Sequence, residues 1–401
     1  MTTIRAVRPY RFDLTVALTY YLPYTSGLTE VARTVAEGLA ARGRRVAVVA
    51  SRHDPSSPVR ERVNGVDVFR TPVAARIGRG VLSPGFLPLA ARLARASRAV
   101  NIHLPMLEAG PLALLAGRTP VITTHHDDVW LPPGRLAGLQ VPVVDASVAT
   151  ALRRSAAVVV NNADHAEHSR HWPLMRDRLA VIAPPCRFRE PAPATFRDGP
   201  GPHIGFLGRI APEKGLHHLV DAFRAIGDPT ARLLIAGDYS KVAGGSVVGA
   251  LRERSAGDPR IRFTGFLADP QVAEFYASLD VFALPSVAEE SFGISQTEAM
   301  MTGVPSVACD APGMRVPVTS TGFGRLFPPG DAAALAGALL EAAAFPPGRR
   351  AEGGRETRDR YGTESCLDRY DELLDALGVV GRVAGWPRDG RAAKSTPPYG
   401  A

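Results

Sequence analysis

Apolar runs and amphipathic helical segments alternate along the first half of the chain. Residues 14–19 and 45–50 are almost uninterrupted apolar runs, which is typical of strands covered on both faces in a parallel sheet. Between them, Val31, Val35 and Leu39 recur at helical spacing after a turn that contains a glycine. This succession predicts a strand, a glycine turn, a helix and a second strand.

The same order returns in the second half. Residues 203–207 form a short apolar run, a turn follows, and apolar residues then recur on one helical face at Leu216, Leu219, Val220 and Phe223. Strands that alternate with helices in both halves predict an α/β protein built on parallel sheets. With 401 residues, 45% of them hydrophobic, the chain is long enough to bury more than one core.

A stretch rich in proline and glycine separates the two halves, which is a composition typical of a linker. Near the end, residues 367–377 have a helical pattern, and the chain then becomes rich in glycine, arginine, proline and alanine, which favours disorder. The predicted organisation is a first domain at 1–187, a linker at 188–202, a second domain at 203–360, a terminal helix at 361–378 and a disordered tail at 379–401.

Two acidic residues, Glu290 and Glu298, flank a glycine late in the chain. The four residues that end in Glu298 have the S-x-x-E form of a capping box, so a helix is expected to begin there. Gly293 and Ile294 would then present backbone N–H groups at the positive end of that helix, where a diphosphate is stabilised. In the alternative interpretation, Glu298 is only a capping residue and Glu290 is a solvated loop acid.

The turn after residues 203–207 carries two cations, Arg209 and Lys214. Doubly wound α/β folds bind phosphates at the carboxyl ends of their strands, which is where this turn is predicted to lie. The chain has 47 basic residues but only three lysines, at 214, 241 and 394. A lysine kept in so arginine-rich a sequence suits a pyrophosphate, although a lysine in an exposed loop explains it as well.

Together these segments resemble the retaining glycosyltransferases of family 4, which have the GT-B fold. The turn matches the family pattern G-R-x-x-x-x-K-G, and the acidic pair matches E-x7-E about 75 residues later. The resemblance implies two Rossmann-like, doubly wound domains that face a central cleft. It also implies that Arg209 and Lys214 bind the diphosphate of a nucleotide sugar, that Glu290 lies near the donor sugar, and that Glu298 binds the ribose.

In the first half, family members usually carry two adjacent glycines in the first turn, whereas this chain has Ser26-Gly27. The resemblance therefore places the close approach of backbone to donor at Gly27 alone. The segment T-x-H-x-D of the family matches Thr124, His126 and Asp128, and implies that His126 lies beside the transferred sugar.

Residues 125–128 read His-His-Asp-Asp at the end of an apolar run, which suggests the edge of a cleft. A metal site is disfavoured, because adjacent residues of an extended chain point to opposite faces and cannot converge on one ion. His103, at a similar strand end, is a second acceptor-side candidate beside Asp128. A purely structural hydrogen bond would explain either histidine, and the acids and histidines at 164–168 are expected to form a solvated helix end.

The net charge of +8 permits three interpretations of the basic region at 42–100, which has twelve arginines and three acids. It is a membrane-docking surface, a surface for an anionic acceptor, or a solvated face in an arginine-rich sequence. The last is favoured, because prolines and glycines interrupt the region and leave only 89–100 helical by pattern. Membrane contact therefore stays possible but is not favoured.

Other features restrict the class of protein further. Nucleic-acid binding is disfavoured because no zinc-finger or RNA-recognition motif is found. Three widely spaced cysteines predict neither a disulfide framework nor a zinc site. We find no apolar segment long enough to span a bilayer and no secretory signal, so a cytoplasmic location is expected.

The sequence therefore predicts a retaining, metal-independent hexosyltransferase. It would move sugar from a UDP- or GDP-linked donor to a soluble small-molecule acceptor, in bacterial natural-product or glycoconjugate biosynthesis. No cofactor is expected beside the nucleotide-diphosphate sugar, which acts as co-substrate. The alternatives are a peripheral-membrane enzyme with a lipid-linked acceptor, a non-catalytic sugar-nucleotide-binding protein and an arginine-rich nucleic-acid-binding protein.

Overall fold

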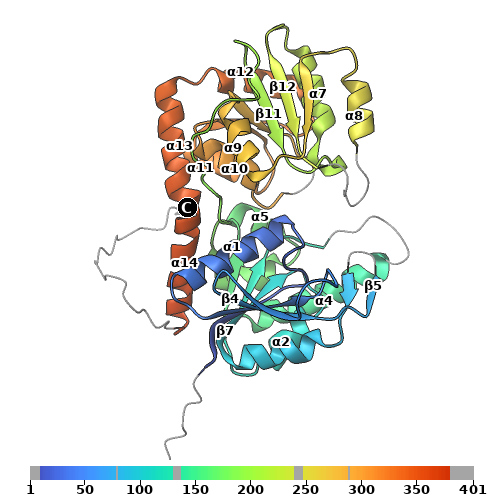
Figure 1. Ribbon diagram of the computed structural model, residues 1–401, viewed down its shortest axis with the longest axis vertical. Helices are drawn as coiled ribbons and strands as arrows, with labels where there is room; N and C mark the ends of the chain where they lie inside the picture. The colour runs from blue at the N-terminus through green and yellow to red at the C-terminus, as the bar shows by residue number, and fades with distance from the viewer. Residues whose placement is uncertain (1–9, 78–79, 130–136, 239–246, 288–289, 380–401) are drawn as a thin grey trace, which may run out of the picture.

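The computed structural model of the chain describes residues 10–77, 80–129, 137–238, 247–287 and 290–379. These residues form two lobes, one above the other in Figure 1, each with a sheet between layers of helices. The tail expected at 379–401 lies outside the described residues except for Val379. That residue is 1% exposed, and its carbonyl accepts a hydrogen bond from Arg44 Nη1 at 2.7 Å.

Within the described residues, the first lobe holds a sheet of eight strands in the order β10-β9-β8-β7-β1-β2-β4-β3. All neighbours are parallel except β3 and β4. The strands are β1 (Phe12–Ala17), β2 (Val46–Ser51), β3 (Arg60–Val63), β4 (Val66–Thr71), β7 (Ser97–Leu104), β8 (Val121–His125), β9 (Ala157–Val160) and β10 (Leu179–Val181). A hairpin of β5 (Ala75–Ile77) and β6 (Gly80–Leu82) lies beside the sheet.

Both faces of this sheet are covered, which explains why its central strands are mainly apolar. Every residue of β1 and β2 is buried. Val35 and Leu39 of α1 pack into one of the two cores, and Val31 is buried on the same helix, as their spacing predicts. The helices of this lobe are α1 (Gly27–Ala41), α2 (Phe86–Arg95), α3 (Ala109–Leu115), α4 (Ala137–Arg154), α5 (Ala163–Glu167), α6 (Trp172–Met175) and the 3₁₀ turn η1 (Arg176–Arg178).

The helix expected at 89–100 is only partly correct. Helix α2 ends at Arg95, and the buried strand β7 begins two residues later. Arg92 and Arg95 are exposed on α2, whereas Arg98 lies on β7, with Nε 3.3 Å from Asp13 Oδ1. Arg70 is 3% exposed and its guanidinium pairs with Glu61, so the basic region is not one continuous surface.

The second lobe has six described strands, all parallel, in the order β13-β12-β11-β14-β15-β16. They are β11 (His203–Leu207), β12 (Arg232–Ala236), β13 (Ile261–Gly265), β14 (Val281–Leu284), β15 (Ser306–Cys309) and β16 (Gly324–Phe327). This is the strand order 3-2-1-4-5-6 of the doubly wound fold, with its reversal between β11 and β14.

Helices cover both faces of the second sheet as well. The apolar face predicted for 216–223 is buried in the core of this lobe. The helices of this lobe are the 3₁₀ turn η2 (Pro212–Lys214), α7 (Leu216–Ala225), α8 (Val248–Arg254), α9 (Asp269–Ala277), α10 (Ile294–Met301), α11 (Val316–Thr321), α12 (Ala332–Ala343) and α13 (Pro347–Tyr361). The helix that follows, α14 (Thr363–Ala376), packs on the first lobe.

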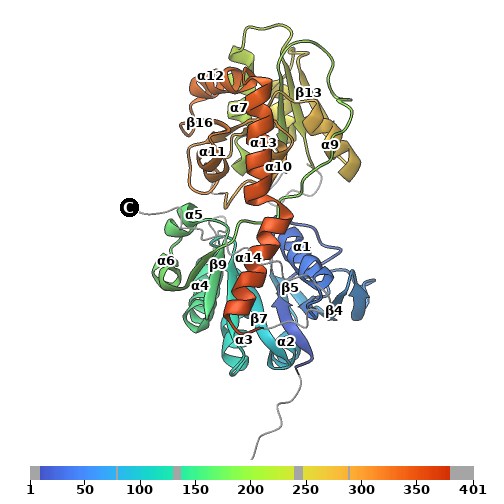
Figure 2. The same cartoon turned by 90° about the vertical axis from the view of Figure 1, so that its left-hand side faces the viewer.

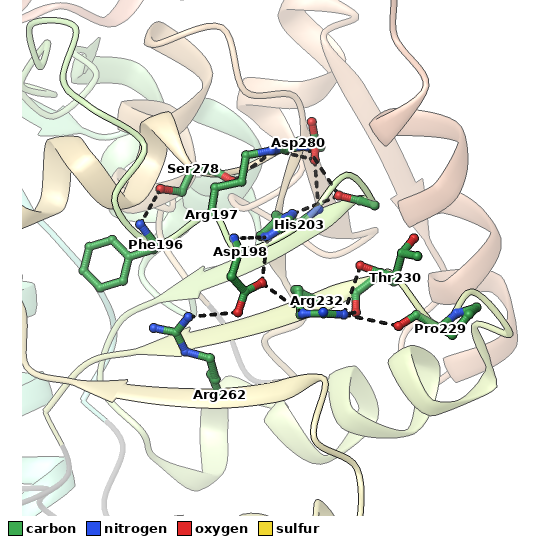
Figure 3. A network of polar contacts seen from close by, with 12 residues as sticks. Phe196, Arg197, Asp198, His203, Pro229, Thr230, Arg232, Arg262, Ser278 and Asp280 are labelled. Atoms are coloured by element: carbon green, nitrogen blue, oxygen red, sulfur yellow. Dashed lines mark hydrogen bonds and ion pairs between the residues drawn. The ribbon is translucent and has the colours of Figure 1, made fainter.

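The chain between the sheets is pinned to the second lobe (Figure 3). The carboxylate of Asp198 accepts hydrogen bonds from Arg232 Nε at 2.9 Å and Arg262 Nη1 at 3.2 Å. Its backbone N–H donates to Nε2 of the fully buried His203, whose Nδ1 donates to the carbonyl of Gly201. These four polar contacts hold a segment whose composition indicates only a linker.

The chain crosses between the lobes twice, and the crossings lie side by side. Helices α13 and α14 run along one side of the molecule, with α13 on the upper lobe and α14 on the lower (Figure 2). Cys366, Leu367 and Tyr370 of α14 pack into the core of the first lobe. The outgoing crossing bridges the returning one, because Cys186 N donates to Tyr361 O at 3.2 Å and Thr363 Oγ1 donates to Cys186 O at 3.2 Å.

Candidate active site

The turns that follow β11 and β14 meet where the strand order of the second sheet reverses. Gly215 lies in the first turn with φ of +61°, and a Cβ at this position would stand 2.1 Å from the carbonyl oxygen of Pro285 in the second. Val287 N also donates to Glu213 O at 3.0 Å. Only glycine permits this approach, so the cations of one turn are brought to the carboxylate of the other.

Lys214 and Glu290 form the centre of this arrangement. Lys214 Nζ lies 3.0 Å from Glu290 Oε1, and both side chains are largely buried. Ser286 Oγ donates to Glu290 Oε2 at 2.8 Å, which fixes the carboxylate from the other side. Arg209 is more open, with 56% of its side chain exposed and Nη2 3.1 Å from Glu213 Oε1. The structure thus brings together Lys214 and Glu290, with Arg209 on the same turn.

Helix α10 begins differently from the capping box expected in the sequence. Its first residue is Ile294, its N-cap is Gly293 with φ of +85°, and no side chain caps it. The prediction of a helix start at Ser295 was wrong, because a left-handed glycine ends the loop two residues earlier. Gly293 and Ile294 therefore do stand at the N-terminal end of α10, the favourable end for an anion.

Glu298 lies one turn into α10 and faces the segment that links the lobes. Its Oε2 is 3.2 Å from Arg189 Nη2, each side chain being 12% exposed, and its Oε1 accepts from Arg187 N at 3.2 Å. Burial raises the pKa of Glu298, and Arg189 offsets only part of that effect. Burial lowers the pKa of Arg189, yet Glu298 and Asp269 leave it raised overall. The capping interpretation of Glu298 is thereby excluded, and its role toward ribose stays a prediction.

In the first lobe, His126 lies directly after β8 and contacts His103 at the end of β7. His103 Nδ1 and His126 Nε2 share a hydrogen bond of 2.9 Å, and the rings stack with centroids 5.1 Å apart. Burial lowers the pKa of His103 to about 3, and burial together with His103 and His125 lowers the pKa of His126 well below its ordinary value. Both imidazoles are therefore neutral at pH 7 and act as hydrogen-bonding groups.

Asp128 is held by its neighbours at the end of the same segment. Its carboxylate accepts from Ser169 Oγ at 2.8 Å and from Arg170 N at 3.0 Å, and it lies 3.3 Å from His125 Nε2. Burial alone would raise the pKa of Asp128, but these donors lower it overall. Asp128 is thus an ionised, positioned carboxylate, and His125 rather than His126 is its histidine partner.

Gly27 is the first residue of α1, and the residue that caps this helix is Ser26. The Ser26 side chain accepts a hydrogen bond from Thr29 N at 3.2 Å. A Cβ added at Gly27 would meet no atom within 4 Å. The fold itself therefore does not require glycine here, and the predicted contact with donor stays a prediction.

A cavity of about 600 Å³ opens at the reversal of strand order in the first sheet, between the carboxyl ends of β1 and β7. Both acceptor-side candidates, His103 and Asp128, line it. Sequence reasoning missed the rest of its wall, which comes from the β1–α1 turn, the β5–β6 hairpin, the β7–α3 turn and helix α4. Such cavities, at about 300–1,000 Å³, are the size of small-molecule sites.

The lobes also touch beside the Glu290 loop. Asn161 Nδ2 donates to Ser291 Oγ at 2.9 Å, and Asp164 Oδ2 accepts from Gly313 N at 2.9 Å and Arg315 Nε at 3.0 Å. The solvated helix end expected at 164–168 is therefore wrong for Asp164. No periodicity signals this contact, because its partners are 130 to 151 residues apart. Among the described residues, no cluster of three or more His, Cys, Asp or Glu side chains is placed to hold a metal ion.

Comparison with known proteins gives the family. Residues 26–185 match the family described as "Glycosyl transferase 4-like domain", and residues 201–344 match "Glycosyl transferases group 1". The 2-deoxystreptamine glucosyltransferase of Streptomyces kanamyceticus is 32% identical over 69% of this chain and 77% of its own length. The chain belongs to the GT4-type glycosyltransferases.

Two further comparisons concern a second relative of this glycosyltransferase and a solved structure that resembles it. A phosphatidyl-myo-inositol mannosyltransferase of Mycobacterium leprae is 38% identical, over 35% of this chain and 37% of that one. The sucrose-phosphate synthase structure from Thermosynechococcus elongatus superposes with a TM-score of 0.74 at 21% identity, covering 91% of this chain and 98% of that one. The GT-B fold and the family expected from the sequence are thus confirmed. Among its described helices, the glycosyltransferase has none long and apolar enough to cross a membrane.

Proposed function

We propose that this glycosyltransferase moves a sugar from a UDP- or GDP-linked donor to a soluble small-molecule acceptor, with retention of configuration and without a metal ion. The observation that carries the proposal is the Lys214–Glu290 contact of 3.0 Å beside the N-terminus of α10. A bound diphosphate would replace Glu290 as the partner of Lys214. Arg209 and the backbone N–H groups of Gly293 and Ile294 would supply further contacts to the diphosphate.

The reaction follows from the same groups. The bond between the anomeric carbon and the leaving diphosphate oxygen breaks, a bond to the acceptor hydroxyl oxygen forms on the same face, and the hydroxyl proton passes to the departing phosphate. Charge grows on that phosphate in the transition state, where Lys214 and Arg209 stabilise it in place of a divalent ion. Released from Lys214, Glu290 holds the donor sugar, neutral His126 hydrogen-bonds one of its hydroxyls, and Glu298 binds the ribose.

A soluble acceptor is supported by the cavity in the first lobe and by the similarity to the 2-deoxystreptamine enzyme, which extends over most of both chains. The similarity to the phosphatidyl-myo-inositol enzyme is confined to about a third of each chain. We therefore assign the cavity lined by His103 and Asp128 to the acceptor.

Thermal unfolding measured with UDP, GDP and ADP tests the donor site. At least one nucleotide should raise the melting temperature, and Lys214→Ala should abolish the rise, whereas the exposed control Arg92→Ala should keep it. The coupling constant of the anomeric proton in the product then reports retention, and EDTA should leave the rate unchanged. A protein that no nucleotide stabilises, or a product of inverted configuration, would refute the proposal.

A further inference from the structure

The charge of the cavity in the first lobe departs from that of the whole chain. The chain has 47 basic residues against 39 acidic ones, yet the described residues that line the cavity include no arginine and no lysine. They include two carboxylates, Glu108 and Asp128, and the neutral His103. Among the described residues that line the cavity, those with a charge are carboxylates, so a phosphate on the acceptor would meet like charge from them.

The two carboxylates differ in how they are satisfied. Asp128 already accepts hydrogen bonds from Ser169 and Arg170 N and lies beside His125. Glu108 directly precedes α3 at the end of the β7 turn, and no described residue forms an ion pair with it. Burial raises the pKa of Glu108, since its ionised form loses hydration without gaining a cation. A cationic ligand would supply the missing charge.

The rest of the wall suits the frame of such a ligand. Tyr20 and Tyr24 line the cavity with ring centroids 4.7 Å apart, and aromatic rings attract cations through their faces. The other walls are mainly apolar and come from the start of α1, β6, the β7–α3 turn and α4, with Leu28, Val81, Met106 and Val143 among them. Aliphatic walls favour burial of the C–H face of a ring. The cavity therefore combines a carboxylate with an apolar surface.

We propose that the acceptor is an amine, held by a protonated amino group against Glu108, with its ring on the tyrosines and apolar wall. The amine serves recognition, while a hydroxyl of the same molecule attacks the donor. This inference rests on the proposed function for its reaction but not for its binding site. It separates the acceptor from phosphorylated sugars and from anionic lipid head groups.

Three cyclitols of similar ring size test the charge directly: 2-deoxystreptamine, myo-inositol and a myo-inositol monophosphate. Calorimetric titration without donor should show at least tenfold tighter binding of 2-deoxystreptamine than of myo-inositol, and weakest binding of the phosphate. Because no donor is present, failure of the transfer reaction leaves this measurement intact. Binding of the phosphate equal to or tighter than that of myo-inositol, or no preference for the amine, would overturn the inference.

Glu108→Gln locates the effect. The variant should lose about tenfold in affinity for 2-deoxystreptamine, as expected when a charge-assisted hydrogen bond becomes a neutral one, and should keep its affinity for myo-inositol. Glu372→Gln removes the same charge from an exposed position on α14 and should change neither. Nucleotide-induced stabilisation should persist in both variants, which confirms that they are folded. An unchanged preference for the amine in Glu108→Gln would assign recognition elsewhere and refute the role of this residue.

Discussion

Arg189 and Glu298 form a buried ion pair, and we expect replacement of Arg189 to lower the stability of the protein more than replacement of Glu298. Removing Arg189 leaves a carboxylate that is 12% exposed without its cation, while Arg187 keeps Asp269 occupied from 2.7 Å. Breaking such a pair from one side generally costs about 3–5 kcal/mol. Replacing Glu298 by glutamine removes the charge that burial opposes, and Arg189 retains Asp269 at 2.6 Å. Glu298→Gln is therefore expected to cost no more than about 1 kcal/mol.

An upper limit for the stability lost in Arg189→Ala follows from the free energy of protonating Glu298. An unpaired Glu298 can take up a proton, and doing so at pH 7 from its ordinary pKa of 4.5 costs about 3.4 kcal/mol at 1.36 kcal/mol per pH unit. We therefore expect a loss near 3 kcal/mol at pH 7. A carboxyl whose folded pKa is raised contributes stability at low pH that is lost as pH rises. The deficit of Arg189→Ala should accordingly shrink to about 1 kcal/mol at pH 5.

Thermal unfolding at pH 7 and pH 5 checks this asymmetry. For lobes of this size, 1 kcal/mol shifts the midpoint by about 2–4 °C, so Arg189→Ala should fall by about 6–12 °C at pH 7 and Glu298→Gln by less than about 4 °C. The double variant should be more stable than Arg189→Ala alone. If Glu298→Gln proved as unstable as Arg189→Ala, or if the two losses simply added, the carboxylate would be a net stabiliser and this reasoning would fail.

The remaining predictions concern activity and the surface. Lys214→Ala and Arg209→Ala should each raise the barrier by about 2.7–4 kcal/mol, seen as a fall of kcat at saturating donor with the fold intact; near-normal turnover would remove the diphosphate assignment. Glu290→Gln should lower kcat, whereas Glu298→Gln should mainly raise KM for the donor, because ribose contacts change little during transfer; the reverse pattern in initial-rate kinetics would exchange their roles. Sedimentation with anionic vesicles should show little binding even at low salt, since Arg70 is buried and Arg98 pairs with Asp13, so the exposed arginines of the region are not on one continuous helix face; tight, salt-sensitive binding lost in Arg92→Gln/Arg95→Gln would favour a lipid-linked acceptor.

Local patterns in the sequence predicted the elements and the class of fold but not the partners of buried charges. The apolar faces of α1 and α7 follow from spacing, because burial of one helix face is a local requirement. The predicted helix start at Ser295 was wrong because the S-x-x-E pattern alone does not fix the first residue of a helix. The left-handed backbone of Gly293 makes Ile294 the first residue of α10 instead. The boundary between α2 and β7 was missed because no strong breaker lies between Arg95 and Ser97.

In the candidate site, too, the sequence predicted the local motifs but not the contacts between distant residues. The turn with Lys214 and the loop with Glu290 were each visible as short motifs, and strand order explains why they meet. Arg189 pairs with Glu298 across 109 positions, and the cavity wall is assembled from five separate segments. Such contacts depend on the packing of the whole molecule, so neither periodicity nor spacing announces them.

The paired crossings between the lobes limit how the enzyme can move. A single flexible tether would let one lobe swivel, slide and bend relative to the other. Here Cys186 is hydrogen-bonded to Tyr361 and Thr363, so the two crossings lie side by side and form a hinge. Twisting would stretch one crossing against the other, whereas bending about their common line strains neither. The proposed donor and acceptor sites lie in different lobes, so we expect them to approach and separate mainly by this one bending motion.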